Sequence, residues 1–348
     1  MKRKIFKKIF GFAVAIAVLA AGSLIVAYNL FYGSAVEKDY SIFVSNCVQY
    51  SDFTAEVKKN INSSLKNRAF DIYAAHLNLE SRLKAGHYVI KRGQSVISIV
   101  RMFVLGEQTP VRLVIGGART LPQLAGRVSK QIMADSTALL TALRNKELKA
   151  KFGYKRDSII AMFIPNTYQV YWTITPEQLL ERMSREYNAF WNENREALLA
   201  TTKLTKYQAM TLASIVYEET KNRAEMPKIA GVYINRLRKG IKLQACPTVK
   251  YAMGDFALTR ILYKHLRYDS PFNTYRNAGL PPAPICIPSI AAIDAVLNYD
   301  KNNYLYFCAK PEFDGTHNFA RTLSEHNANS RKYNEAYKRL KKEKNAGK

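Results

Sequence analysis

Two adjacent glutamates end an apolar stretch of the sequence, ASIVYEET at residues 213–220. A carboxyl group can donate a proton to a leaving oxygen and, once ionised, accept one, so each glutamate is a candidate general acid or base. Neighbouring side chains on a helix point about 100° apart, so Glu218 and Glu219 would meet different surroundings. What either can do depends on the element that carries it.

That element is expected to be a single helix. Thr205, followed three residues later by a glutamine, matches a capping box and predicts the helix start. At about 100° per residue, the apolar residues of the run form one stripe. Glu219 falls within this stripe, whereas Glu218 falls on the opposite side with Thr211 and Ser214. We therefore expect Glu218 to face outward and Glu219 to face the buried side.

A carboxyl group on an apolar face has three explanations. Glu219 can pair with a cation such as Arg236 on the following helix, or lie at the stripe's edge with its head in water. Alternatively, burial raises its pKa and keeps it protonated near neutral pH, as a general acid requires. The pattern favours Glu219 over Glu218 and leaves all three explanations open.

The N-terminus predicts a membrane anchor. Residues 1–8, MKRKIFKK, carry five positive charges, and residues 9–33 are apolar and uncharged. About 20 apolar residues in a helix span a bilayer, so this run is long enough. Basic residues before a span normally stay in the cytoplasm, which places the rest of the chain outside. The alternative is a cleaved signal peptide, with AAGS at residues 20–23, but the apolar run outlasts a typical signal core.

Composition narrows the partners. The 348 residues include 53 Lys and Arg against 27 Asp and Glu, a net charge of +26 that favours anionic partners. Outside a membrane these are lipid headgroups or wall polymers, and we expect no nucleic-acid partner because no such motif is recognised. The four cysteines are scattered, so we expect no metal site, and the pairing of any disulfides stays open.

Beyond the anchor, the patterns indicate an α+β fold. Strand-like and helix-like segments follow one another at residues 83–94, 95–108, 111–117, 120–132, 164–172 and 175–199. The first three suggest a small strand-helix-strand module. After residue 240 the chain is rich in Pro, Gly, Asn and aromatic residues, which is typical of binding loops on a helical scaffold.

Several ordered segments resemble the MltG family, the YceG-like endolytic murein transglycosylases. They are ASIVYEET, GVYINRLRKGIKLQACPTVKYAMG, SPFNTYRNAGLPPAPICIPS, YLYFCAK and HNFARTLSEHN. The resemblance implies a single-pass protein of the inner (cytoplasmic) membrane, with a cytoplasmic N-terminus and a catalytic domain on the periplasmic side. It implies a membrane-proximal LysM-like subdomain at residues 34–115, a mixed α+β catalytic domain at 116–340 and a Lys-rich tail at 341–348.

The resemblance also implies a reaction. Nascent peptidoglycan glycan strands, made by peptidoglycan synthases that are possible partners, would be cut internally to give 1,6-anhydro-N-acetylmuramic acid ends. The family's catalytic glutamate precedes the Thr of this segment and matches Glu219, which would act first as acid and then as base, without a cofactor. An ordinary glycosidase needs a second carboxylate at about 5–5.5 Å or 6.5–9.5 Å. A hydrolase that uses Asp255, Asp269 or Asp314 therefore stays open.

Further residues match polar positions of the family. As implied substrate-binding residues they are Gln244, Thr248, Asn273, Thr274, Tyr275, His317 and His326, and Asn235 would orient Glu219 or bind substrate. The two histidines could equally stabilise the last loop. Two departures, Cys246 for a usual Asp and Ile287 for a usual Asn, keep an alternative open. This alternative is a non-catalytic peptidoglycan-binding or scaffold protein of the wall-synthesis machinery.

Overall fold

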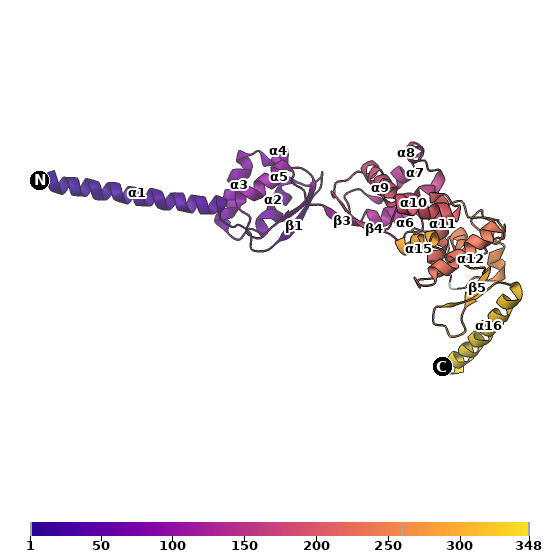
Figure 1. Cartoon of the computed structure of the whole chain (residues 1–348). Helices are drawn as coiled ribbons and strands as arrows, with labels where there is room; N and C mark the ends of the chain where they lie inside the picture. The colour runs from indigo at the N-terminus through magenta and orange to yellow at the C-terminus, as the bar shows by residue number, and fades with distance from the viewer. Residues whose placement is uncertain (1, 259, 347–348) are drawn as a thin grey trace. The chain divides into compact units, whose positions relative to one another are not determined.

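The computed structural model describes residues 2–258 and 260–346. The chain forms two compact units (Figure 1): Met1–Arg112 with Gln169–Ile174, and Leu113–Tyr168 with Thr175–Lys348. Both contain helices and short antiparallel strand pairs, which confirms the mixed α+β class. The functional boundaries at residues 34–115 and 116–340, and the likeness to LysM, stay predictions.

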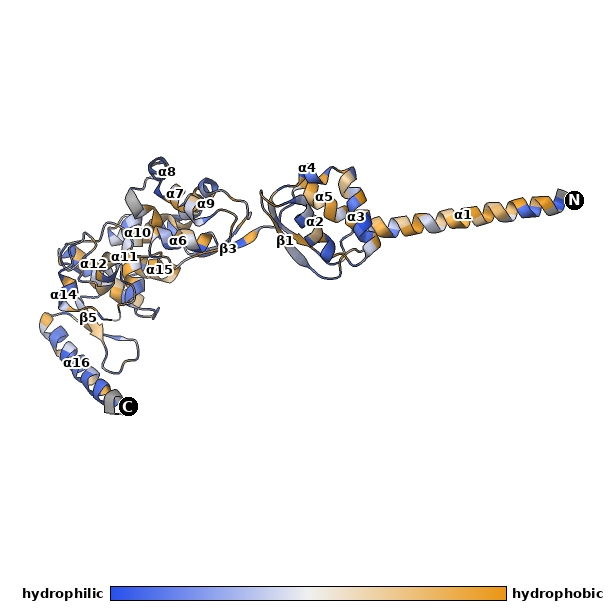
Figure 2. Cartoon of the chain, turned by 180° about the vertical axis from the view of Figure 1, so that it is seen from behind, coloured by the Kyte–Doolittle hydropathy of each residue, from blue (hydrophilic) through white to orange (hydrophobic). Residues whose placement is uncertain are grey.

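The first unit begins with helix α1, Lys2–Tyr32. Its segment Ile5–Tyr32 is long and apolar enough to cross a membrane, and the apolar 18-residue window within it is 0% buried in the protein. Figure 2 shows it coloured hydrophobic along most of its length, with hydrophilic residues at the N-terminal end. A membrane-spanning helix therefore fits the sequence and the structure, whereas its orientation stays a prediction.

The rest of this unit packs helices against one strand pair. β1 (Tyr40–Val44) and β2 (Gly86–Ile90) are antiparallel, with Tyr40 opposite Ile90. The helices are α2 (Tyr50–Lys59), α3 (Ser64–His76), α4 (Leu79–Arg82) and α5 (Val96–Leu105). As the sequence predicts, Ser95 caps α5 and Gly106 ends it in a left-handed conformation. The core is mostly aliphatic and includes a group of aromatic rings, in which Phe53 and Tyr88 both pack edge-on against Phe103.

The structure shows how the strands of the predicted strand-helix-strand module pair. β3 (Val111–Ile115) pairs with β4 (Asn166–Val170), and not with β2. The predicted strand, helix and strand of residues 83–117 are therefore present as β2, α5 and β3, and the strand β1, which the sequence patterns did not reveal, is the partner of β2. Local patterns give strands, but pairing depends on segments far apart in sequence.

The second unit is mainly helical. The unit boundaries fall within β3 and β4. The elements that belong wholly to the second unit are α6 (Leu121–Val128), α7 (Ser136–Arg144), α8 (Lys146–Lys151), η1 (Arg156–Met162), α9 (Pro176–Phe190), α10 (Glu193–Thr202), α11 (Lys206–Glu219), α12 (Met226–Arg238), α13 (Cys246–Met253), α14 (Tyr263–Leu266), α15 (Ile290–Leu297), β5 (Tyr306–Ala309), β6 (His317–Ala320) and α16 (Leu323–Ala346). The predicted helix at residues 175–199 is two helices, because Trp191 leaves the helical conformation and Asn192 caps α10.

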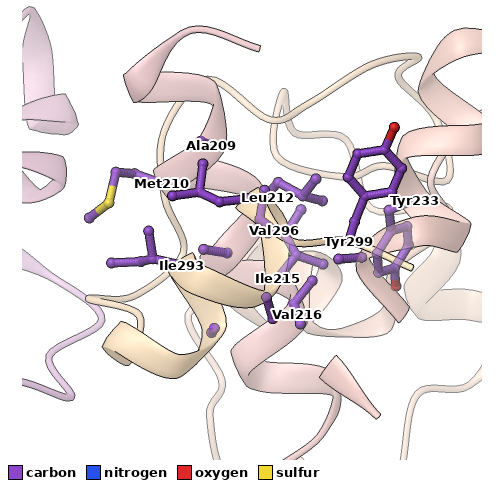
Figure 3. Close-up of a cluster of buried hydrophobic side chains, with 14 of the residues drawn as sticks. Ala209, Met210, Leu212, Ile215, Val216, Tyr233, Ile293, Val296 and Tyr299 are labelled. Carbon is purple, nitrogen blue, oxygen red and sulfur yellow. The ribbon is translucent and has the colours of Figure 1, made fainter. Parts of the chain in front are cut away.

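Helix α11 lies at the centre of this unit. It begins at the predicted capping box, and Leu212, Ile215 and Val216 pack against α15 residues such as Val296 (Figure 3). Residues 209–216 are all at most 1% exposed, so the helix is buried on every side through this stretch.

The predicted polar face of α11 is therefore wrong. Thr211 and Ser214 are buried, and their hydroxyls donate to the backbone carbonyls of Tyr207 and Thr211. Small hydroxyl side chains can be buried in this way because the helix backbone satisfies them. Ser214 also accepts a hydrogen bond from the backbone N–H of Ile285, which joins a distant loop to the helix.

Candidate active site

Glu219 is the last residue of α11, and Thr220 ends the helix in an extended conformation. Its Oε1 atom accepts a hydrogen bond of 2.7 Å from the hydroxyl of Tyr233 on α12. Tyr233 is 1% exposed, and its ring packs edge-on against Phe307 of β5 at 5.8 Å between centroids. A buried hydroxyl on a packed ring thus fixes one oxygen of the carboxyl group.

The Glu219 carboxyl belongs to the wall of a cavity of about 390 Å³. The wall comes from the end of α11, from α12, from the loop before α13, and from β5 and its neighbours. Its described residues include Tyr233, Arg236, Gln244, Cys246, Tyr275, Tyr306, Cys308, His317 and His326. Among the described residues of this wall, Glu219 is the one carboxylic acid. The cavity, called the Glu219 cavity below, therefore offers one acid and several hydrogen-bonding groups.

The surroundings raise the pKa of Glu219. Burial is the largest cause, because it disfavours the charged carboxylate, and the charge of Glu218 acts in the same direction. The Tyr233 hydrogen bond and the nearby His317 and Lys250 oppose this effect without cancelling it. Glu219 can therefore hold a proton at higher pH than an exposed glutamate does.

Glu218 lies in a different environment. Its Oε2 atom accepts a 2.9 Å hydrogen bond from Arg119, and Lys221 lies 3.9 Å from Oε1. The side chain is only 18% exposed, so the prediction that it faces outward is partly right: it points away from the Glu219 cavity, but into an ion pair rather than into water. Both oxygens of the Glu218 carboxylate thus lie near a cation.

Arg236 does not pair with Glu219, so that explanation is wrong. Its guanidinium donates to the backbone oxygens of Lys242 and Leu305, at 2.7 and 2.8 Å, and to Oε1 of Gln244 at 2.6 Å. The guanidinium of Arg236 thus connects α12 to the loop before α13 and to the residue that precedes β5. Arg236 thus shapes the cavity wall.

Comparison with known proteins shows which family the chain belongs to. A model of the YceG-like family matches residues 48–332, which is most of the chain. The chain belongs to the YceG-like family. This confirms the family that the sequence segments resemble.

Relatives of this YceG-like chain extend over most of its length. It is 30% identical over 341 residues to a Bacillus subtilis (strain 168) protein named endolytic murein transglycosylase, covering 89% of this chain and 91% of that protein. A Streptococcus pneumoniae (strain D39) protein of the same name is 29% identical over 294 residues, covering 75% of this chain and 52% of that protein. The crystal structure of a yceG-like protein from Listeria monocytogenes matches with a TM-score of 0.56 at 27% identity, covering 84% of this chain and 98% of that chain.

Four of the predicted substrate-binding residues lie in the wall of the Glu219 cavity: Gln244, Tyr275, His317 and His326. The Tyr275 hydroxyl lies 3.2 Å from the thiol of Cys246, and His317 Nδ1 lies 2.9 Å from a carboxylate oxygen of Glu225. His326 stacks on Tyr306, and its buried Nδ1 has no hydrogen-bond partner within the described structure. Burial lowers the pKa of His326, which favours the neutral ring. Binding of substrate by these residues stays a prediction.

The other four predicted residues, Asn235, Thr248, Asn273 and Thr274, do not line this cavity. The amide of Asn235 donates to the backbone oxygens of Asn302 and Tyr304, so it fastens that loop and does not contact Glu219. Thr248 and Thr274 share a buried hydrogen bond of 2.9 Å. The Asn273 amide donates to backbone oxygens of the preceding loop. All four organise loops in this structure, and direct binding of substrate stays a prediction.

Tyr233, the hydrogen-bond partner of Glu219, is a site residue that the sequence did not predict. Tyr233 lies two residues before Asn235 in the same family segment, but nothing in the helical pattern shows which side chain of α12 reaches the end of α11.

The structure also shows where the four cysteines and Ile287 lie. All four cysteines are free thiols, Cys246 and Cys308 line the Glu219 cavity, and Ile287 is 1% exposed and lies outside the cavity wall.

Proposed function

We propose that this chain is an endolytic murein transglycosylase that cuts nascent peptidoglycan glycan strands, with Glu219 as its acid and base. The observation that carries the proposal is the carboxyl group of Glu219, the one acid in the described wall of its cavity, with a raised pKa and one oxygen held by Tyr233. The relatives named endolytic murein transglycosylase in Bacillus and Streptococcus support the choice of reaction.

The arrangement suits a reaction in two proton transfers. Tyr233 engages Oε1, which leaves Oε2 to carry the proton toward the glycosidic oxygen in the proposed reaction. As the bond from C1 of N-acetylmuramic acid to that oxygen breaks, the oxygen takes the proton. The C6 hydroxyl of the same sugar then forms a bond to C1, and its proton passes to the Glu219 carboxylate. The products are a free hydroxyl on one fragment and a 1,6-anhydro end on the other, with Glu219 restored and no water consumed.

A two-carboxylate hydrolase has less support. Glu218 is held by Arg119, and Glu225 is held by His317. The carboxylates of Asp255, Asp269 and Asp314 do not belong to the described wall of the Glu219 cavity. A glycosidase requires its second carboxylate near the bond that is cut. One-carboxylate chemistry fits the cavity better.

The cellular setting is part of the proposal. Helix α1 would anchor the chain in the inner membrane with residues 1–8 in the cytoplasm, and the rest of the chain would meet the glycan on the outer side. Peptidoglycan synthases, which make nascent strands, are the partners that this setting suggests. Labelling of single cysteines placed on either side of α1, from outside intact cells, would test the orientation.

The decisive test is product analysis. Full-length protein in detergent is incubated with uncrosslinked peptidoglycan, and the products are identified by mass spectrometry. Wild type and the control Glu218→Gln should give anhydro-muramyl ends, and Glu219→Gln should give none. Reducing ends would establish a hydrolase instead. If folded wild-type protein binds glycan without cutting it, the scaffold alternative is established. The observation that favours this alternative is the thiol of Cys246 in the cavity wall.

A further inference from the structure

A second, larger cavity lies at the other end of α11. Its volume is about 1200 Å³, and its wall includes Thr205, Lys206 and Tyr207 at the helix start. Glu219 is the last residue of the same helix, so at 1.5 Å per residue the two ends are about 20 Å apart. Six aromatic side chains belong to its wall: Phe152, Tyr154, Tyr187, Tyr207, Tyr251 and Phe272. We call this site the aromatic cavity.

The rings of this cavity are held in place before any ligand arrives. The Tyr207 hydroxyl donates to the backbone oxygen of Pro282 at 2.6 Å, and the hydroxyls of Tyr154 and Tyr187 are hydrogen-bonded to each other. Tyr251 and Phe272 pack at 4.7 Å between ring centroids. A preformed wall binds without first ordering its side chains, which lowers the free-energy cost of binding.

The chemistry of the wall points to a sugar rather than to a lipid. Among its described residues none is Leu, Ile, Val or Met, the side chains expected around a flexible hydrocarbon chain. Tyrosine-rich walls combine an apolar ring with a polar hydroxyl. A pyranose ring presents the matching surface, with apolar C–H faces and polar hydroxyl and acetamido groups at its edge.

The charge of the cavity wall indicates which kind of sugar fits best. Lys155 and Lys206 belong to the wall, and none of its described residues is acidic. Lys206 also pairs with Glu196, so Lys155 contributes the more distinct positive charge. A site with this balance favours an anionic ligand. Sugars that carry a carboxylate substituent therefore fit better than neutral ones.

Two segments of the chain form part of both cavities. α13 contributes Cys246 to the Glu219 cavity and Tyr251 to the aromatic cavity. The segment 271–275 likewise contributes Tyr275 to the first and Phe272 to the second. The two cavities thus share two wall segments, and a linear polymer that follows these segments would occupy both.

We propose that the aromatic cavity binds an N-acetylated, carboxylate-bearing sugar of the same glycan strand, several sugars away from the bond at Glu219. This inference rests on the proposed function for the identity of the strand. It adds a distant binding site that makes the enzyme prefer long strands. The cut then falls at a set distance from the sugar that the aromatic cavity holds.

The test measures binding separately from cleavage. Full-length Glu219→Gln protein in detergent is titrated with fluorescently labelled, uncrosslinked glycan strands, one long set and one too short to span both cavities. Phe152→Leu removes a ring from the aromatic cavity, with Tyr263→Leu, an 89% exposed ring elsewhere, as its control. Lys155→Glu reverses a charge in the wall, with the exposed Lys146→Glu as its control.

We expect Phe152→Leu and Lys155→Glu each to raise the Kd for long strands about tenfold, the effect of losing one stacking or charge contact. The controls should bind as the parent does. In protein that keeps Glu219, we expect a lower KM for long strands than for short ones. Phe152→Leu and Lys155→Glu should each abolish this difference. Because the titration needs no cleavage, it tests the aromatic cavity even if the chain cuts no glycan.

Three results would overturn the proposal. The first is an unchanged Kd for long strands in both cavity variants. The second is an equal loss for short and long strands, which would place the effect at the Glu219 cavity. The third is unchanged strand binding together with lost binding of a detergent-solubilised polyprenyl phosphate, which would assign the cavity to a lipid.

Discussion

Replacing Tyr233 by Phe tests the link between the structure and the reaction most directly. The substitution removes the hydroxyl that donates to Glu219 Oε1 at 2.7 Å and keeps the ring that packs on Phe307. A hydrogen bond to a charged group contributes about 1.5–3 kcal/mol. Tyr233 is 1% exposed, so water cannot readily replace the lost donor. The affected species is the ionised carboxylate, which forms as the proton leaves for the glycosidic oxygen.

The same bond also sets the pH dependence. The Tyr233 hydroxyl stabilises the carboxylate and so lowers the pKa of Glu219 against the effect of burial. Without it the pKa rises further. Glu219 must be protonated to act as an acid, so the fall in activity on the alkaline side moves to higher pH. At neutral pH we expect kcat to drop about tenfold to a hundredfold, the equivalent of that hydrogen-bond energy in the barrier.

The assay is the initial rate of anhydro-ended product across acidic, neutral and alkaline pH, with thermal melting of each variant. Tyr299→Phe is the matched control, since its buried hydroxyl accepts from Arg238 and its ring lies in the same hydrophobic cluster (Figure 3). It should keep the wild-type profile. If Tyr233→Phe melts as wild type does and keeps both its kcat and its alkaline limb, the assigned role of Tyr233 is refuted.

Three further predictions follow from named contacts. Because its pKa is raised, the folded protein holds the Glu219 proton at a pH where the unfolded chain has lost it, and wild-type stability falls as pH rises through that window. Glu219→Gln should therefore melt at a higher temperature than wild type at neutral pH, with the gain disappearing in acid; a gain that is equal at all pH would contradict this. Arg119→Leu should destabilise the fold by about 1 kcal/mol in urea unfolding, because it strands the partly buried Glu218, and adding Glu218→Gln should recover part of the loss. Gly231→Ala would place a Cβ atom 2.3 Å from the backbone oxygen of Asp300 and should cost about 1–3 kcal/mol, while Gly126→Ala, with open space around it, should be neutral or stabilising. Equal effects of the two glycine substitutions would show that the close approach in α12 is not what matters.

Local features of the site were predictable because they depend on nearby residues. The capping box at Thr205 fixed the start of α11, and the periodicity separated Glu219 from Glu218. The predicted exposure of the polar face of α11 was nevertheless wrong, since Thr211 and Ser214 are buried. Helical periodicity predicts that polar side chains face solvent. Serine and threonine hydroxyls can instead form hydrogen bonds within the helix, so these residues can be buried in a core.

Partners that come from distant segments were not predictable. The contact of Tyr233 with Glu219 depends on how α12 packs against α11, and no single-helix pattern contains that information. The pair of His317 with Glu225 joins residues 92 positions apart. Neither pair could be found without knowing which segments meet, even though the sequence places His317 in a recognisable family segment.

Helix α12 explains why so many polar residues surround a one-carboxylate site. Within a single turn, Tyr233 reaches Glu219, Asn235 fastens the loop at residues 302–304, and Arg236 fastens Gln244 and the approach to β5. Each of these side chains joins α12 to a different segment of the wall. The proton chemistry we assign to Glu219 requires one exposed oxygen at a fixed position, and this demands a rigid frame rather than further acids. Polar residues near the site therefore serve first to hold that frame.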